Sequence, residues 1–86
     1  MESRDIRLKR LRYRSTYTGT KETDTLLGEF AARHLAALPD ELIDQYEALL
    51  DNDDPDLYQW ISGQKPLPLE RDNDIMKLLM NFRVSE

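Results

Sequence analysis

Apolar side chains recur every three or four residues between residues 21 and 38, and this spacing constrains the fold more than any other feature. The positions are Leu26, Leu27, Phe30, Ala31, Leu35 and Leu38. Because an α-helix turns once every 3.6 residues, the spacing places all six on one stripe of a helix. No segment shows the alternation of apolar and polar residues that is typical of a strand. The sequence therefore predicts an all-α fold.

Proline and glycine divide the rest of the chain into further predicted helices. Pro39 suits the first turn of a second helix, and Asp54 followed by Pro55 predicts the capped start of a short helix that Gly63 closes. An extended connection through two prolines precedes a last helix of about three turns near residues 75–82. The apolar residues expected to face inward on these helices are Leu42, Ile43, Tyr46, Leu49, Leu50, Leu57, Tyr58, Trp60, Ile61, Ile75, Met76, Leu79 and Phe82.

A first helix over residues 5–16 brings the predicted count to five. Ile6, Tyr13 and Tyr17 share one side of it, whereas Leu8 and Leu11 lie almost opposite. Short connections between helices favour antiparallel neighbours. We expect a compact five-helix bundle in which residues 1–86 form a single small domain.

The size and composition of the chain exclude several classes of function. A chain of 86 residues buries only roughly 60 to 65% of its unfolded surface, so a deep catalytic pocket is hard to build. The absence of cysteine excludes a disulfide scaffold, a thiolate metal site and a cysteine nucleophile. We expect a protein that is not an enzyme.

The same sequence predicts where the chain resides and how it associates. No apolar run approaches the ~20 residues that span a bilayer, and the first residues lack the apolar core of a signal peptide. We expect no membrane span and a chain that is cytosolic, or mature. No sustained heptad pattern is present, so we expect a monomer.

The first helix is strongly basic. Arg or Lys occupies six of the eleven positions 4–14, and residues 1–14 carry six basic and two acidic side chains, a net charge of +4. Residues 15–86 carry six basic and fifteen acidic side chains, a net charge of −9. Basic runs can neutralise phosphates, yet the acidic remainder opposes a nucleic acid. We therefore expect no nucleic-acid partner and favour an acidic protein, with a merely solvated basic helix as the alternative.

Three other features have plain structural explanations. The acids at residues 51–56 fail the EF-hand pattern, because Asp56 and Ser62 stand where that loop needs Gly and Glu, so helix capping explains them and no metal is expected. His34 follows the apolar side of the strongest helix and is interpreted as a core or boundary histidine. Trp60 is interpreted as a core residue, as are Tyr58 and Tyr46.

The segment from Thr18 to Asp24 has two interpretations that physical chemistry alone leaves even. Gly19 relaxes the backbone at a turn, and Glu22 falls in the first turn of the long helix, near its positive end. One interpretation is simple helix-start chemistry, and the other is a binding site.

At this segment the chain resembles the SdhE family, small helical assembly factors for the flavoprotein subunit of succinate dehydrogenase. The family motif is Arg-Gly, two variable residues and Glu, followed by Asp and a Leu-rich helix start. The residues that fall in step with it are Gly19, Glu22, Asp24, Leu26, Leu27, Gly28 and Phe30. A basic lead-in from Arg10 to Tyr13 and a later block comprising Asp56, Leu57, Trp60 and Gly63 also match, so the resemblance covers residues 6–82.

One departure from the motif concerns Thr18, which stands where the family has arginine. Threonine cannot supply a guanidinium, so a bidentate contact by that arginine to a carboxylate is lost. Arg14 lies four residues earlier, and we hypothesise that it partly substitutes. The fold assignment is unaffected.

The resemblance implies a factor that promotes covalent attachment of FAD to a histidine of the flavoprotein subunit of succinate dehydrogenase, with fumarate reductase as a further possible client. FAD would be carried by the client, and this chain would bind no cofactor tightly. The residues expected to contact the client are Arg12, Arg14, Thr18, Gly19, Lys21, Glu22 and Asp24. The alternative is an antitoxin-like regulatory protein, a role attached to some relatives under the name CptB, which would oppose a membrane-associated toxin.

Overall fold

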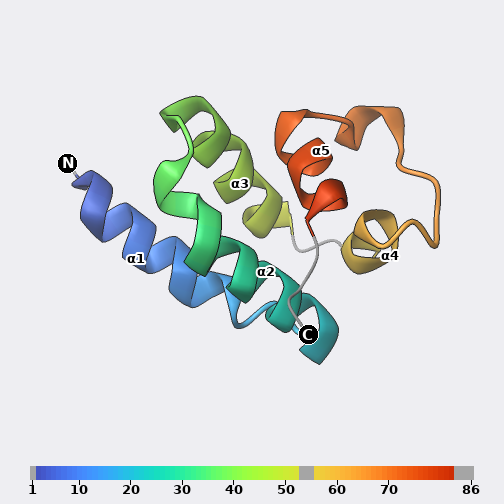
Figure 1. The fold of residues 1–86 in the computed structure, drawn as a ribbon, viewed down its shortest axis with the longest axis horizontal. Coiled ribbons are helices and arrows are strands. Elements are labelled where there is room, and N and C mark those ends of the chain that lie inside the picture. The colour runs from blue at the N-terminus through green and yellow to red at the C-terminus, as the bar shows by residue number, and fades with distance from the viewer. Residues whose placement is uncertain (1, 53–55, 83–86) are drawn as a thin grey trace.

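A computed structural model describes residues 2–52 and 56–82, and within these ranges the chain folds into five α-helices with no strand (Figure 1). The predicted all-α class and helix count are confirmed. The predicted cap of Asp54 and Pro55 lies outside the described residues. The elements in chain order are α1 (Arg4–Ser15), α2 (Lys21–His34), the 3-10 turn η1 (Leu35–Ala37), α3 (Asp40–Asn52), α4 (Leu57–Ile61), the 3-10 turn η2 (Leu69–Arg71) and α5 (Asp74–Asn81).

The apolar stripe predicted for residues 21–38 lies in the core. Leu27 and Leu35 are fully buried, as are Ile43 of α3 and Leu79 of α5. Burying a leucine or isoleucine side chain stabilises the fold by roughly 1.5 to 3 kcal/mol relative to leaving it exposed, so this stripe organises the bundle. Trp60 is also buried, which confirms its interpretation as a core residue.

Tyr46 joins three helices at the centre of the bundle. Its side chain is fully buried, and its hydroxyl lies 2.5 Å from Ser15 Oγ at the end of α1 and 3.4 Å from the carbonyl oxygen of Leu27 in α2. Burial raises the pKa of Tyr46 to about 12, so the phenol keeps its proton. The buried hydroxyl is satisfied, as a polar group removed from water must be.

α1 packs by one side only. Leu8, Leu11 and Ser15 face the core, whereas Ile6 and Tyr13 are exposed. The sequence showed two apolar sides, and the structure settles which of them is buried. Figure 1 shows α1 running beside α2 and α3 at one end of the molecule.

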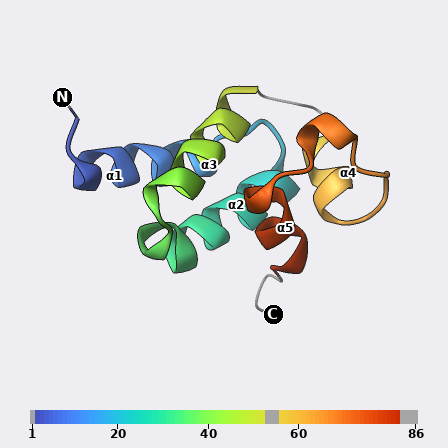
Figure 2. The same cartoon turned by 90° about the horizontal axis from the view of Figure 1, so that it is seen from above.

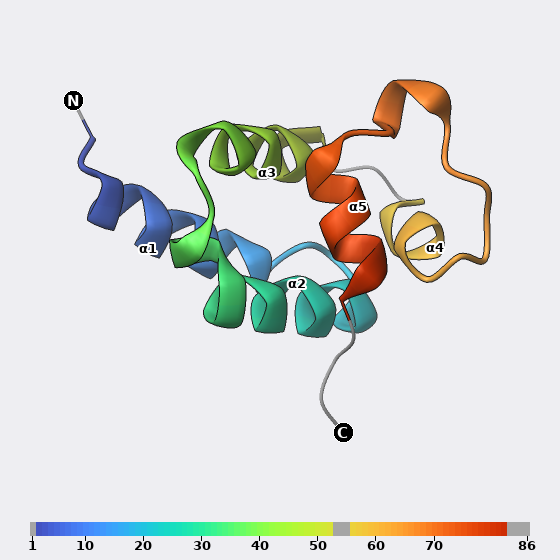
Figure 3. The same cartoon turned by 45° about the horizontal axis from the view of Figure 1, so that its top comes forward.

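The C-terminal elements close the other end of the bundle. Figures 1 and 3 show α5 between α3 and α4, and Figure 2 places α1 and α4 at opposite ends of the long axis. Asn73 caps α5 by accepting a hydrogen bond from the backbone N–H of Met76 at 3.0 Å. The side chain of Gln45 in α3 accepts a second one, from the N–H of Ile75. These contacts satisfy orphan donors at the start of α5.

His34 lies at the boundary of the core. The residue is exposed, yet its ring centroid lies 5.5 Å from that of Phe30 and 5.4 Å from that of Phe82. The interpretation as a boundary histidine is therefore confirmed, and the core alternative is wrong. Among the helices that the structure describes, none is both long enough and apolar enough to cross a bilayer.

Candidate functional site

The turn between α1 and α2 contains the motif and has a backbone shape that requires glycine. Gly19 has φ +107°, in the region that residues with a side chain rarely adopt. Immediately after it, Thr20 caps α2, because its hydroxyl oxygen accepts a hydrogen bond from the N–H of Thr23 at 3.2 Å. The turn is thus fixed on its C-terminal side by a helix cap.

Thr18 and Asp24 fix the same turn from its N-terminal side. The backbone N–H and the hydroxyl of Thr18 both donate to Asp24 Oδ1, each at 2.5 Å. The Thr18 hydroxyl and then the Thr18 N–H lower the pKa of Asp24 below its ordinary value, so the carboxylate stays ionised at neutral pH. The threonine that replaces the family arginine therefore braces the motif turn. We call this contact the Thr18–Asp24 brace.

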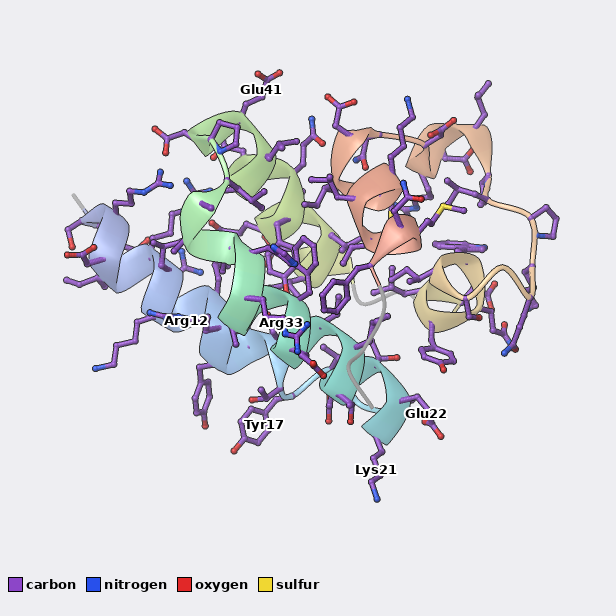
Figure 4. All side chains as sticks on the ribbon, viewed as in Figure 1. Arg12, Tyr17, Lys21, Glu22, Arg33 and Glu41 are labelled. Atoms are coloured by element: carbon purple, nitrogen blue, oxygen red, sulfur yellow. The ribbon has the colours of Figure 1, made fainter. Side chains whose placement is uncertain are left out.

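Lys21 and Glu22 point away from the bundle at the start of α2 (Figure 4). Neither forms an ion pair with another residue in the described part of the chain. Glu22 instead borders a shallow hollow with Leu26 and Tyr58. Of the expected contact residues in the motif, these two are therefore exposed to solvent, whereas the half-buried Asp24 is bonded to Thr18.

Arg12 and Arg14 differ in their surroundings. Arg12 is exposed and has no ion-pair partner among the residues that the structure describes. Arg14 Nη1 lies 2.7 Å from Asp51 Oδ1 at the end of α3. Because Arg14 is paired with Asp51, its hypothesised substitution for the family arginine would require it to leave that acid. That substitution stays a prediction.

An open hollow of about 530 Å³ connects the motif turn with the ends of α1 and α3. Its walls combine aromatic, hydroxyl and charged side chains. A chain this small thus offers a recess beside the turn that can receive a side chain of a partner. The residues that line it are Tyr13, Arg14, Tyr17, Thr18, Gly19, Thr20, Thr23, Leu49, Leu50, Asp51 and Leu57.

A ladder of ion pairs between α1 and α3 was missed in the sequence. Arg7 Nη2 lies 2.7 Å from Asp44 Oδ1, and its Nε lies 2.9 Å from Glu47 Oε1. Arg10 reaches Glu47 as well, at 3.1 Å. These acids hold the pKa of Arg7 above its usual value, with Asp44 the larger cause. The rungs are Arg4 with Asp40, Arg7 with Asp44 and Glu47, Arg10 with Glu47, and Arg14 with Asp51.

The sequence carried a signal for this ladder. Asp40, Asp44, Glu47 and Asp51 follow one another at four, three and four residues, the spacing of one helix face. An acidic face of this length beside a basic helix indicates that the two helices pair. Four of the six basic side chains of residues 4–14 are therefore paired with acids of α3.

Comparison with known proteins identifies the family. The family described as "Sdh5: Flavinator of succinate dehydrogenase" matches residues 9–83. A mitochondrial succinate dehydrogenase assembly factor 2 from Meyerozyma guilliermondii is 40% identical over 89 aligned positions, covering 99% of this chain and 66% of the relative. An assembly factor 2-B from Drosophila ananassae is 42% identical over 91% of this chain and 49% of the relative.

A third relative, succinate dehydrogenase assembly factor 2 of Mycosarcoma maydis, is 42% identical over 78% of this chain and 28% of its own length. The chain thus spans between about a quarter and two thirds of the length of these relatives. The family match over residues 9–83 agrees with the resemblance found in the sequence, which covers residues 6–82. Both include the motif turn. Since the match extends over residues 9–83, the chain belongs to the family of succinate dehydrogenase flavinators.

Proposed function

We propose that this chain promotes covalent attachment of FAD to the flavoprotein subunit of succinate dehydrogenase by binding the immature subunit. The observation that carries the proposal is the family match over residues 9–83, which includes the whole motif turn. The names of the relatives describe assembly of succinate dehydrogenase, and they give no support to the antitoxin alternative.

The geometry of the motif turn supports a binding role. A turn fixed on both sides, by the Thr18–Asp24 brace and by the cap at Thr20, loses little conformational entropy when a partner binds. Lys21 and Glu22 are then held in a defined direction beside Gly19. The space around Gly19 is open, because a Cβ added there would meet no atom within 4 Å. This rigid presentation suits recognition of a protein surface.

The mechanism that we propose is a population shift of the client. The bond between FAD and the client histidine forms between groups that lie outside this chain. The factor accelerates it by binding the attachment-competent conformation of the client more tightly than the others, since equal affinity for all conformations would shift nothing. In this proposal the chain is not itself an enzyme, and FAD stays with the client.

The test is a flavin attachment assay with purified components. The protein is mixed with FAD and the flavin-free flavoprotein subunit, and covalently bound flavin is followed by fluorescence on a denaturing gel. We expect faster attachment with the protein than without it, and a Thr18→Arg variant run in parallel shows what the family arginine adds. No acceleration by either protein would contradict the proposed function.

Three further properties belong to the same proposal and have separate tests. Equilibrium dialysis of the isolated protein against FAD should show no tight binding. Sedimentation should show a monomer, and the same attachment assay with the flavoprotein subunit of fumarate reductase measures the client range. The proposed location is the compartment of the client, which is the cytoplasm or the mitochondrial matrix.

A further inference from the structure

The surface of α1 is divided into three sides of different chemistry. Residues three, four or seven apart share a side of a helix. One side, with Leu8 and Leu11, is buried, and a second side contains the arginines of the ladder with α3. The third side contains Ile6, Lys9 and Tyr13, which follow one another at three and four residues, and all three are exposed. We call this third side, together with Arg12 and with Tyr17 and Lys21 farther along the chain, the tyrosine face.

The cations of the tyrosine face are not neutralised. Arg4, Arg7, Arg10 and Arg14 all face acids across the ladder. Within the described ranges, Lys9, Arg12 and Lys21 form no ion pair. One acid of α1, the exposed Asp5, lies four residues before Lys9 and seven before Arg12, and it forms no ion pair with either. A partner carboxylate can therefore approach these cations without breaking an ion pair, whereas any carboxylate that approached the ladder would meet the acids of α3.

The two aromatic rings of the tyrosine face are largely exposed. Tyr13 is 67% exposed and Tyr17 is 69% exposed, and their ring centroids lie 4.7 Å apart. Ile6, at 60%, extends the same side. Tyrosine is enriched at the centres of protein interfaces, because a rigid ring brings a large contact area at a small entropic cost. Figure 4 shows Tyr17 and Lys21 pointing away from the bundle on the same side.

We propose that the tyrosine face is a client-binding surface that takes an acidic segment of the flavoprotein subunit. The inference rests on the proposed function and specifies its partner chemistry. The paired rings of Tyr13 and Tyr17 pack on the apolar part of the segment, and the cations around them bind its carboxylates. The same two tyrosines border the hollow beside Gly19, so the surface is continuous with the motif turn.

The charge of the whole chain separates a protein segment from other anionic partners. The net charge is −5, and residues 15–86 alone carry −9. A phosphate backbone or an anionic membrane is a broad negative surface, which the acidic remainder of the chain repels. A short acidic protein segment can follow the free cations of the face and avoid the ladder.

The experiment measures binding of the full chain to purified flavin-free flavoprotein subunit. The charge variant is Lys9→Gln with Arg12→Gln, which lowers the net charge by two, and its matched control is Lys77→Glu, which lowers it by the same amount at an exposed cation of α5. We expect the charge variant to raise Kd roughly tenfold and to flatten the salt dependence of the association rate, because exposed charges act mainly on encounter. The control should bind like the unmodified protein.

The aromatic variant is Tyr13→Ala with Tyr17→Ala, and its matched control is Leu69→Ala, which truncates an 86% exposed apolar side chain elsewhere. We expect a rise in Kd of roughly thirtyfold for the aromatic variant, the scale of an interface hot spot, and none for the control. Circular dichroism checks that each variant keeps its helices, which is expected because every altered side chain is exposed. A photoreactive phenylalanine analogue in place of Tyr13 should crosslink to a client peptide rich in Asp and Glu.

The outcomes separate this proposal from the proposed function. Acceleration of FAD attachment by the unmodified protein, with both face variants binding as tightly as it, would overturn the tyrosine face alone. A loss of binding in the Lys77→Glu control equal to that of the charge variant would also overturn it, since net charge would then be the cause. Crosslinking to a peptide without acids, or binding to anionic phospholipid vesicles that the face variants lose, would overturn the acidic protein segment as the partner. Failure of the unmodified protein both to bind and to accelerate would contradict the proposed function itself.

Discussion

The molecule contains two glycine turns that look alike in the backbone and are held in different ways. Gly19 follows α1 and has φ +107°, and Gly63 follows α4 and has φ +81°. At both positions an added Cβ would meet nothing within 4 Å. Steric packing therefore distinguishes neither glycine, and the difference lies in what closes each turn.

The turn at Gly63 is closed by main-chain hydrogen bonds. The N–H of Gly63 donates to the carbonyl of Trp60 at 3.2 Å, and the N–H of Gln64 donates to that of Gln59 at 2.8 Å. Such bonds are the usual way in which a helix ends at a left-handed glycine. The turn at Gly19 depends instead on the side chains of Thr18, Thr20 and Asp24.

The comparison indicates which of the two turns is more sensitive to the identity of its side chains. A turn closed by main-chain hydrogen bonds requires only a residue that tolerates positive φ. A turn closed by side chains can change its stiffness and its surface with each substitution while the helices on both sides stay in place. The replacement of the family arginine by Thr18 is a change of the second kind.

The largest effect is expected from Gly19→Ala. A residue with a Cβ at φ +107° costs about 1 to 2 kcal/mol, and relaxing that strain moves the motif turn away from the position that presents Lys21 and Glu22. We expect a lower free energy of unfolding in urea and a marked loss of FAD attachment. Unchanged attachment would show that the shape of the turn is irrelevant to function.

A smaller effect is expected from Gly63→Ala. Its φ of +81° lies nearer the left-handed helical region, so the variant should lose about 1 kcal/mol of unfolding free energy and keep its attachment activity. Gly63→Asn should lose less than Gly63→Ala, because asparagine tolerates this region. Urea unfolding of the two variants measures the difference, and a loss of attachment activity in either would place Gly63 in the client surface.

Most of the fold could be predicted because its signals are local. The spacing of Leu26 to Ala31 specifies a helix and its buried side, and Gly19, Pro39 and Gly63 lie where helices begin or end. The predicted helix extends to Leu38, whereas α2 ends at His34 and Leu35 lies in the 3-10 turn η1. What local spacing could not decide was which side of α1 is buried. Ile6 and Leu8 are equally apolar on their own, and only the packing of α2 and α3 against Leu8 and Leu11 settles the choice.

The position of the candidate site could be predicted from its motif, but the contacts between its residues could not. The motif placed the site at Gly19 and Glu22, yet a brace between Thr18 and Asp24 needs the actual path of the turn between them. The pairing of Arg14 with Asp51 joins residues from two helices, so the sequence alone left Arg14 looking free. Long-range charge pairing therefore changed the interpretation of the basic segment more than any feature of the motif did.

The brace is tested by removing one hydroxyl. Thr18→Val keeps the shape of the side chain and the backbone donor but loses the Thr18 hydroxyl bond to Asp24, whereas Thr18→Ser keeps both bonds. We expect several-fold faster amide hydrogen exchange at residues 18–20 in the valine variant, near-normal exchange in the serine variant, and no change at Gly63 in either. Equal exchange rates in the valine and serine variants would show that the hydroxyl does not hold the turn.

The smallest effect on global stability, and the sharpest contrast between the turns, is expected from pH. Hydrogen bonds from Thr18 lower the pKa of Asp24 below its ordinary value of 3.8, so the brace is fully present above that value. It is lost as the pH falls through the lower folded-state pKa, because protonation removes the charge that accepts both bonds. The amide signal of Thr18 should therefore titrate with a midpoint below 3.8, as measured by NMR, and should not titrate with this midpoint in Asp24→Asn. The bonds at Gly63 join main-chain groups that do not ionise, so a matching transition in the amide signal of Gly63 would mean that acid loosens the whole bundle and that the two turns do not differ as described.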